Sequence, residues 1–117
     1  MEISEASRGG VAWEAGRPVL IGGVCRDCGV GMFPLQPVCP VCMEEAVEAQ
    51  PQPTQGELYS FTVLHVGAPR PRAFGYVDLP NGVRVFSRLG ETDAVIGQAM
   101  SLAADAEGWW FTNGGAA

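Results

Sequence analysis

The four cysteines of this 117-residue sequence form two Cys-x-x-Cys pairs. Cys25 and Cys28 make the first pair, and ten residues separate it from Cys39 and Cys42. Each pair places two thiolates on one side of a tight turn, and two such turns that face each other complete a tetrahedral site. The spacing therefore predicts a structural metal centre, and Zn²⁺ is the expected ion.

Four sulfur ligands leave no coordination position open for water, so hydrolysis at this metal is not expected. A redox iron site of the rubredoxin kind is the main alternative, although rubredoxins separate their two pairs by a much longer stretch. A thioredoxin-like dithiol requires a single pair within a βαβ pattern. No cysteine is left over as a nucleophile. For His65, the single histidine, we expect a structural or surface role.

The arginines form a second group of candidate residues, because all seven basic residues are Arg and none is Lys. Guanidinium groups pair bidentately with phosphates. Two arginines follow the longest predicted strand, and two are spaced four apart on one face of a later strand. The four that we predict to bind CoA or another phosphate are Arg70, Arg72, Arg84 and Arg88. The alternative is that these arginines are solvated and pair with Asp78 or Glu91.

Composition and charge limit the class of function. The chain carries 13 acidic and 7 basic residues, for a net charge of −6. This balance argues against non-specific nucleic-acid binding, which needs a basic surface. No apolar run approaches the roughly 20 residues that span a bilayer, and the acidic N-terminal segment is not a secretory signal. We therefore expect a cytoplasmic protein without membrane contact, in which reduced cysteines bind metal.

The elements that must position these residues are mostly short strands separated by Gly- and Pro-rich turns. Residues 1–16 are expected to form an N-terminal segment that contains the end of a short helix over 11–16, anchored by Trp13. Residues 17–50 are expected to form a zinc ribbon. An acidic, Pro-rich connector is expected over 44–55.

A β-rich block follows over residues 56–113. Five strands are expected, with a hairpin turn at Pro80–Gly82 where Asn81–Gly82 can take positive φ. They lie at 56–66, 73–79, 83–89, 98–104 and 108–112. A closed barrel leaves little exposed sheet edge. The predicted fold is therefore mainly β, with an N-terminal rubredoxin-like zinc ribbon followed by a five-stranded OB-fold barrel.

Tryptophans are candidate anchors for a protein partner. Trp109 and Trp110 are adjacent, so on a strand they face opposite sides, and one of them is expected in the core. An exposed tryptophan is a common anchor at protein interfaces. We therefore predict that Trp13, Trp109 and Trp110 contribute to docking.

From about Trp13 to Phe111, the order of these features resembles that of the zinc-ribbon and OB-fold proteins associated with acyl-CoA metabolism. The segments that carry the resemblance are Trp13–Glu14, Pro18–Leu20, Cys25–Gly29, Phe33–Pro34, the second cysteine pair, Gly56–Val63, Phe74–Pro80, Gly82–Phe86 and Ile96–Gly97. The chain departs from the usual pattern by a short N-terminal helix and by Arg70 and Arg72 in the first barrel loop.

The resemblance implies a companion subunit of a thiolase-fold enzyme, not catalytic alone. Family members form stable complexes with thiolases, thiolase-like aldolases or hydroxymethylglutaryl-CoA-forming enzymes. The ribbon and N-terminal helix dock on the partner, which supplies the nucleophilic cysteine and the acid/base residues, and the barrel helps shape a CoA or acyl-CoA channel. One branch serves thiolases that split aromatic β-oxoacyl-CoA thioesters in anaerobic toluene breakdown, and a short chain is compatible with it.

Two rival functions come from other classes. Zinc ribbons and OB barrels also bind single-stranded nucleic acids, in a basic groove lined with exposed aromatic residues. The absence of Lys and the acidic balance argue against that function. A free-standing electron carrier of the rubredoxin kind is a third reading, which iron content and a red colour would reveal.

Overall fold

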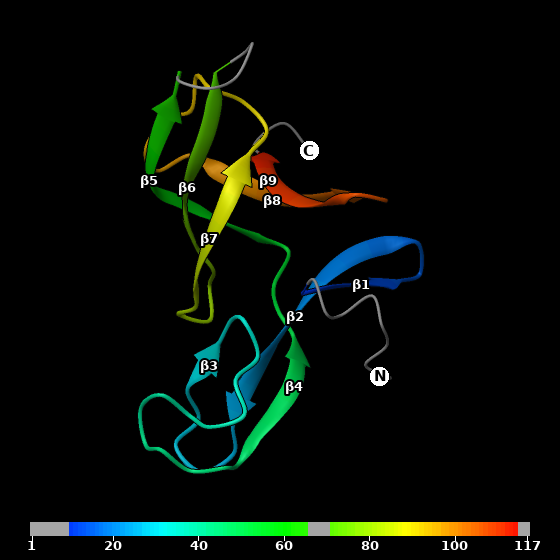
Figure 1. The fold of residues 1–117 in the computed structure, drawn as a ribbon, viewed down its shortest axis with the longest axis vertical. Coiled ribbons are helices and arrows are strands. Elements are labelled where there is room, and N and C mark those ends of the chain that lie inside the picture. The colour runs from blue at the N-terminus through cyan, green and yellow to red at the C-terminus, as the bar shows by residue number, and fades with distance from the viewer. Residues whose placement is uncertain (1–9, 66–70, 115–117) are drawn as a thin grey trace.

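The computed structural model describes residues 10–65 and 71–114, and all regular structure within these ranges is β-strand. Four strands form a ribbon sheet, and five form a closed barrel above it in Figure 1. The strands are β1 (Val11–Glu14), β2 (Arg17–Cys25), β3 (Gly31–Met32), β4 (Val47–Pro51), β5 (Gln55–Leu64), β6 (Arg72–Asp78), β7 (Arg84–Leu89), β8 (Ala99–Asp105) and β9 (Gly108–Asn113). The predicted fold class, a zinc ribbon followed by a five-stranded OB barrel, is confirmed. The described ranges contain no helix suited to crossing a membrane.

The helix that we expected over residues 11–16 is wrong, because this segment contains strand β1 instead. Val11–Glu14 pairs antiparallel with β2, and Glu14 lies opposite Arg17. Ala15 and Gly16 both have positive φ, at 50° and 78°, which is the backbone of a two-residue type I′ hairpin turn. Ala15 is an uncommon residue for such a turn, so the turn signal at this position is weak, and the branched and aromatic residues before it form a strand.

Strand β4 lies within the segment that we expected to be a connector. Val47–Pro51 pairs antiparallel with the second half of β2, from Cys25↔Val47 to Ile21↔Pro51. Four of its five residues are exposed, because β4 pairs along one side only and covers little core. Its polar composition therefore resembles that of a linker, and only the pairing with β2 makes it a strand.

The barrel closes in the order β5-β6-β7-β9-β8, and β8 returns to pair with β5. Strands β7 and β9 pair in parallel at Leu89↔Phe111. The register of β5 against β6 shifts between Leu58 and Ser60, which marks a β-bulge. Leu58 points into the core before the bulge, and Phe61 and Val63 point inward after it. The bulge explains why both alternating faces of this strand carry apolar residues.

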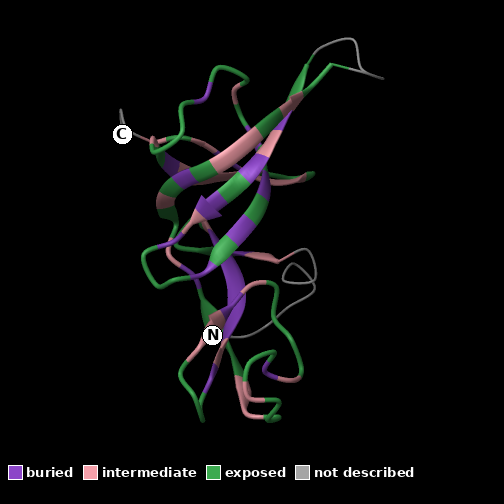
Figure 2. Ribbon diagram, turned by 90° about the vertical axis from the view of Figure 1, so that its left-hand side faces the viewer, coloured by how far each residue is buried: buried purple, intermediate pink, exposed green. Residues whose placement is uncertain are grey.

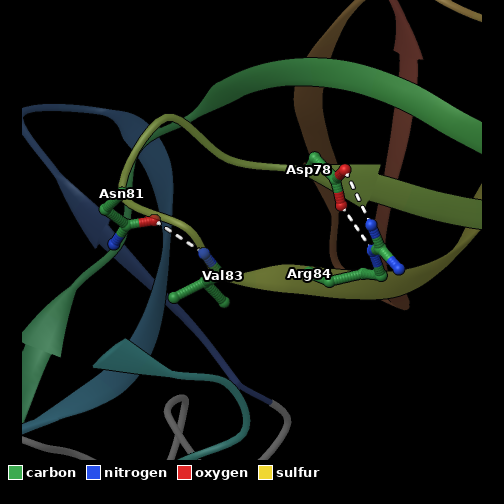
Figure 3. Close-up of polar contacts among 4 residues, drawn as sticks. All are labelled: Asp78, Asn81, Val83 and Arg84. Carbon is green, nitrogen blue, oxygen red and sulfur yellow. Dashed lines mark hydrogen bonds and ion pairs between the residues drawn. The ribbon is translucent and has the colours of Figure 1, made fainter. Parts of the chain in front are cut away.

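A buried glutamine joins the ribbon to the barrel. Gln52 follows β4, is 3% exposed, and accepts a hydrogen bond of 2.9 Å from the Asn81 side chain on the β6–β7 turn. Asn81 Oδ1 also accepts a hydrogen bond from the amide of Val83, which is visible in Figure 3. A Cβ added at Gly22 would collide with the Met32 carbonyl oxygen and the Gln52 side chain. The predicted Pro80–Gly82 turn therefore forms part of this junction.

The barrel core includes a side chain from the ribbon. Leu20 of β2 is fully buried in one cluster with barrel residues such as Leu58, Val85 and Phe111. Along the barrel strands, buried and exposed residues alternate, as Figure 2 shows. Phe33, which follows β3, also packs against this cluster. The ribbon and the barrel therefore share one hydrophobic core.

The shared core predicts that a ribbon substitution destabilises the whole chain. Leu20→Ala removes a fully buried side chain and is expected to lower the free energy of unfolding by about 2–5 kcal/mol, in a single transition. Val41→Ala, at an exposed ribbon position, is the control and should change it by less than about 0.5 kcal/mol. Chemical denaturation followed by fluorescence and circular dichroism measures both. A ribbon transition separate from that of the barrel would contradict the shared core.

Candidate metal centre and ligand-binding surface

The four cysteines come together at the end of the ribbon, as predicted. Their sulfur atoms all lie within 4.8 Å of one another. The Sγ atoms of Cys25 and Cys42 are 3.6 Å apart, and so are those of Cys28 and Cys39. A tetrahedral site with Zn–S bonds of about 2.3 Å places its sulfurs about 3.8 Å apart. The donor set and its spacing therefore fit one Zn²⁺ with all four positions filled by the chain.

The two cysteine turns have the same backbone. The amide of Gly29 donates to the Cys25 carbonyl at 2.8 Å, and the amide of Met43 donates to the Cys39 carbonyl at 2.9 Å. Gly29 and Met43 occupy equivalent positions, and both have positive φ, at 79° and 67°. Glycine adopts this conformation freely, whereas another residue pays about 1–2 kcal/mol. The cluster therefore holds Met43 in an unfavourable backbone conformation.

Backbone amides prepare one thiol for metal binding. The amides of Cys42 and Val41 donate to Cys39 Sγ at 3.5 and 3.4 Å. These hydrogen bonds, that from Cys42 first, lower the pKa of Cys39 to about 7, because they stabilise the thiolate. Thiolates are the form that binds zinc. A bound zinc would hold the ends of β2 and of the 39–42 turn together, which is a structural role.

The structure separates the four predicted arginines. Arg84 forms a bidentate ion pair with Asp78, with distances of 2.6 Å and 3.0 Å (Figure 3). Its guanidinium carbon also lies 3.6 Å from the centre of the Tyr59 ring. The Arg84 guanidinium holds the pKa of the Asp78 carboxyl below its usual range. For Arg84, the alternative of a pair with Asp78 is therefore confirmed.

Arg72 and Arg88 border one cavity of about 840 Å³ at the other end of β6 and β7. Neither guanidinium forms an ion pair with a described carboxylate. Arg88 lies 4.8 Å above the ring of Trp110. Glu91 and Asp93 border the same cavity, and Glu91 accepts a hydrogen bond from the Thr112 hydroxyl at 2.6 Å. Arg70, the fourth predicted residue, lies outside the described residues.

The tryptophans occupy two different surfaces. Trp109 packs edge-to-face against Phe33, at 5.6 Å between ring centres, and against the barrel core. Trp110 lies on the outer face under Arg88, so the adjacent tryptophans do face opposite sides. Trp13 is 50% exposed and borders a cavity of about 530 Å³ together with Trp109. His65 is exposed just after β5.

Sequence reasoning missed a group of outward-facing aromatic residues on neighbouring strands. We name Phe74, Tyr76 and Phe86 the aromatic cluster. The rings of Phe74 and Phe86 are nearly parallel, with centres 6.2 Å apart, and Tyr76 lies 5.2 Å from Phe86. The alternation of Phe74 and Tyr76 with small or apolar residues is the signal that could have found them, once the register of β6 against β7 is known.

The metal centre predicts one zinc per chain and a fold that depends on it. Chelation of the zinc, or Cys39→Ser, is expected to lower the melting temperature by more than about 10 °C, because structural zinc sites contribute folding free energy directly. Metal analysis by mass spectrometry and thermal circular dichroism measure both effects. Iron in a red protein would contradict the zinc assignment, and a chain that stays equally stable without metal would contradict its structural role.

Comparison with known proteins matches both parts of the chain. The model of the rubredoxin-like zinc ribbon domain of ChsH2 matches residues 12–48, and that of the C-terminal OB-fold domain of ChsH2 matches residues 49–105. The benzoylsuccinyl-CoA thiolase subunit BbsA of Thauera aromatica is 40% identical over 75 residues, which are 62% of this chain and 52% of BbsA. BbsA of Geobacter metallireducens is 38% identical over 84 residues, 68% and 57% of the two chains.

Other similar proteins extend this likeness. A DUF35 domain-containing scaffold protein of Methanocaldococcus jannaschii is 30% identical over 80 residues, 62% of this chain and 56% of that protein. The chain thus spans about half the length of the curated relatives that it matches. Among solved structures, the Ltp2-ChsH2(DUF35) aldolase has a TM-score of 0.63 and 24% identity, over 80% of this chain and 82% of that one. A DUF35 protein of unknown function from Sulfolobus solfataricus has a TM-score of 0.65 and 15% identity, and the match covers 81% of this chain and 75% of that one. These two likenesses show the fold alone. The two ChsH2 domain models together cover residues 12–105, and on that match the chain belongs to the ChsH2 family of zinc-ribbon and OB-fold proteins.

Proposed function

We propose that the chain is a non-catalytic accessory subunit of a thiolase-fold enzyme that acts on an acyl-CoA thioester in the cytoplasm. In this role it stabilises the complex and helps form the channel for CoA or acyl-CoA. The relatives named as thiolase subunits, at 40% and 38% identity, support the role. Their names specify benzoylsuccinyl-CoA, which supports the finer proposal that the complex cleaves a β-oxoacyl-CoA in aromatic degradation.

One observation carries this proposal: all four cysteines of the chain belong to the metal cluster. A thiolysis reaction needs a nucleophile and an acid/base group within hydrogen-bond reach of each other. The single histidine, His65, is exposed just after β5. The chain would therefore leave the covalent chemistry to its partner and act through binding and positioning.

The β1–β2 hairpin is the proposed docking element, in place of the expected N-terminal helix. Trp13 of this hairpin is half exposed and borders the cavity that it shares with Trp109. Large aromatic residues that can enter a partner's pocket dominate binding energy at interfaces. The acidic tip of the β8–β9 hairpin, with Asp105 and Glu107, borders the same cavity, so a basic segment of the partner would fit it.

Arg88 and Arg72 are the proposed contacts for CoA phosphates. Both guanidinium groups face one cavity and lack an ion-pair partner among the described residues. Arg84 is already satisfied by Asp78 and Tyr59, so its contribution should be smaller. Arg70, which lies outside the described residues, remains part of the proposal.

The subunit role predicts a stable complex. The zinc-loaded chain carrying an affinity tag, expressed in its source organism, should co-purify with a thiolase-fold protein identified by mass spectrometry. Trp13→Ala should weaken the isolated complex at least about tenfold, because it removes a large interface side chain, whereas Ile96→Ala, at an exposed barrel position, should not change it. If the chain instead recovers nucleic acid through salt-sensitive binding, and no thiolase-fold protein, the result would support the alternative of a module that binds single-stranded nucleic acid.

The phosphate contacts predict different effects for two arginines on the same strand. Arg88→Ala is expected to weaken CoA binding to the complex about tenfold, since it removes a charge-assisted contact. Arg84→Ala is the matched control and should change the affinity less than about threefold, because Arg84 is held by Asp78. Calorimetric titration measures both affinities, with zinc content as a check. Equal effects of the two substitutions would contradict this assignment.

A further inference from the structure

The outer face of β6 and β7 carries an ordered row of side chains. In the register of these strands, Phe74 lies opposite Arg88, Tyr76 opposite Phe86, and Asp78 opposite Arg84. The residues between them on β6 and β7 point into the barrel, so this row is the outward face. The row therefore has a cationic end, an aromatic centre and an end closed by the Asp78–Arg84 ion pair.

The aromatic centre contains a cavity. A space of about 310 Å³ lies against the aromatic cluster and against β5, where the outward Ser60 and Thr62 add hydroxyl groups. Phe86 is 58% exposed and Tyr76 is 43% exposed, so both side chains can be reached from solution. Cavities that bind small molecules have this size and this mixture of aromatic walls with a few polar groups.

The cationic end adjoins this cavity. Phe74 borders the aromatic cavity, and its cross-strand neighbour Arg88 borders the larger cavity next to it. Arg72 lies two residues before Phe74, on the same face of β6. The surface thus places exposed aromatic side chains beside two guanidinium groups without ion-pair partners among the described residues. A ligand that uses both must carry a planar ring and an anionic group.

We propose that the aromatic cluster binds the base of a nucleotide whose phosphates contact Arg88 and Arg72. Bases stack on aromatic side chains, and guanidinium groups bind phosphate bidentately. The net charge of −6 and the absence of lysine favour one compact nucleotide over a long strand. This inference rests on the phosphate contacts of the proposed function, but it concerns the base, and it is tested on the chain alone, without a partner.

The test is a calorimetric titration of the zinc-loaded full chain with adenosine 3′,5′-bisphosphate, CoA, adenosine and pyrophosphate. The bisphosphate should bind more tightly than adenosine or pyrophosphate. Phe86→Leu, which keeps apolar area but removes the ring, should weaken binding at least about tenfold, and Phe86→Tyr should retain it. Ile96→Ala, at an exposed apolar position outside the row, is the control and should have no effect. Tighter binding of CoA would identify CoA as the source of the nucleotide, and equal binding would favour a free nucleotide.

The remaining outcomes separate the base site from the phosphate contacts. Loss of binding in Phe86→Leu without loss in Arg88→Gln would support the base site and contradict the phosphate contacts proposed above. Pyrophosphate that binds as tightly as the bisphosphate, with no effect of Phe86→Leu, would overturn the base site. Much tighter binding of an adenine oligonucleotide than of the mononucleotide, or no binding of any nucleotide, would overturn it as well.

Discussion

Strand β2 connects the metal centre to the hydrophobic core, and the other elements depend on that connection. Cys25 at its C-terminal end belongs to the thiolate cluster, and Leu20 near its middle is buried among barrel side chains. A metal that fixes one end of the strand therefore also fixes the position of a core residue. A chain of 117 residues divided into two independent parts would bury little surface in each. Sharing β2 gives both parts one core.

The same strand sets the relation between the ribbon and the barrel. Its second half pairs with β4, and β4 leads to Gln52, whose buried side chain binds Asn81 on a barrel turn. A buried polar group is stable only when it is hydrogen-bonded, so this contact favours a single arrangement of the two parts. The proposed docking surface near Trp13 and the outer barrel face are thereby held at fixed positions on one framework.

Those two surfaces carry the binding roles that we propose. Every cysteine serves the metal cluster, so the chain retains no thiol for covalent chemistry. The outer barrel face shows how identical residues acquire different roles. Arg84 and Arg88 lie on one face of β7, but Asp78 lies opposite the first and Phe74 opposite the second. The first guanidinium is therefore neutralised within the structure, whereas the second lies over Trp110 and has no ion-pair partner among the described residues.

The sequence alone determined the metal centre and most of the barrel, because both follow from local patterns. Cysteine spacing defines the two metal-binding turns, and alternating apolar residues with Asn81–Gly82 define the hairpin of β6 and β7. Strands β1 and β4 were missed, because Ala15 is a weak turn signal and β4 has the composition of a linker. Only the tertiary structure decided which arginine is paired and which aromatic residues gather on one face. Those outcomes depend on the register between strands and on the bulge of β5, which no local pattern encodes.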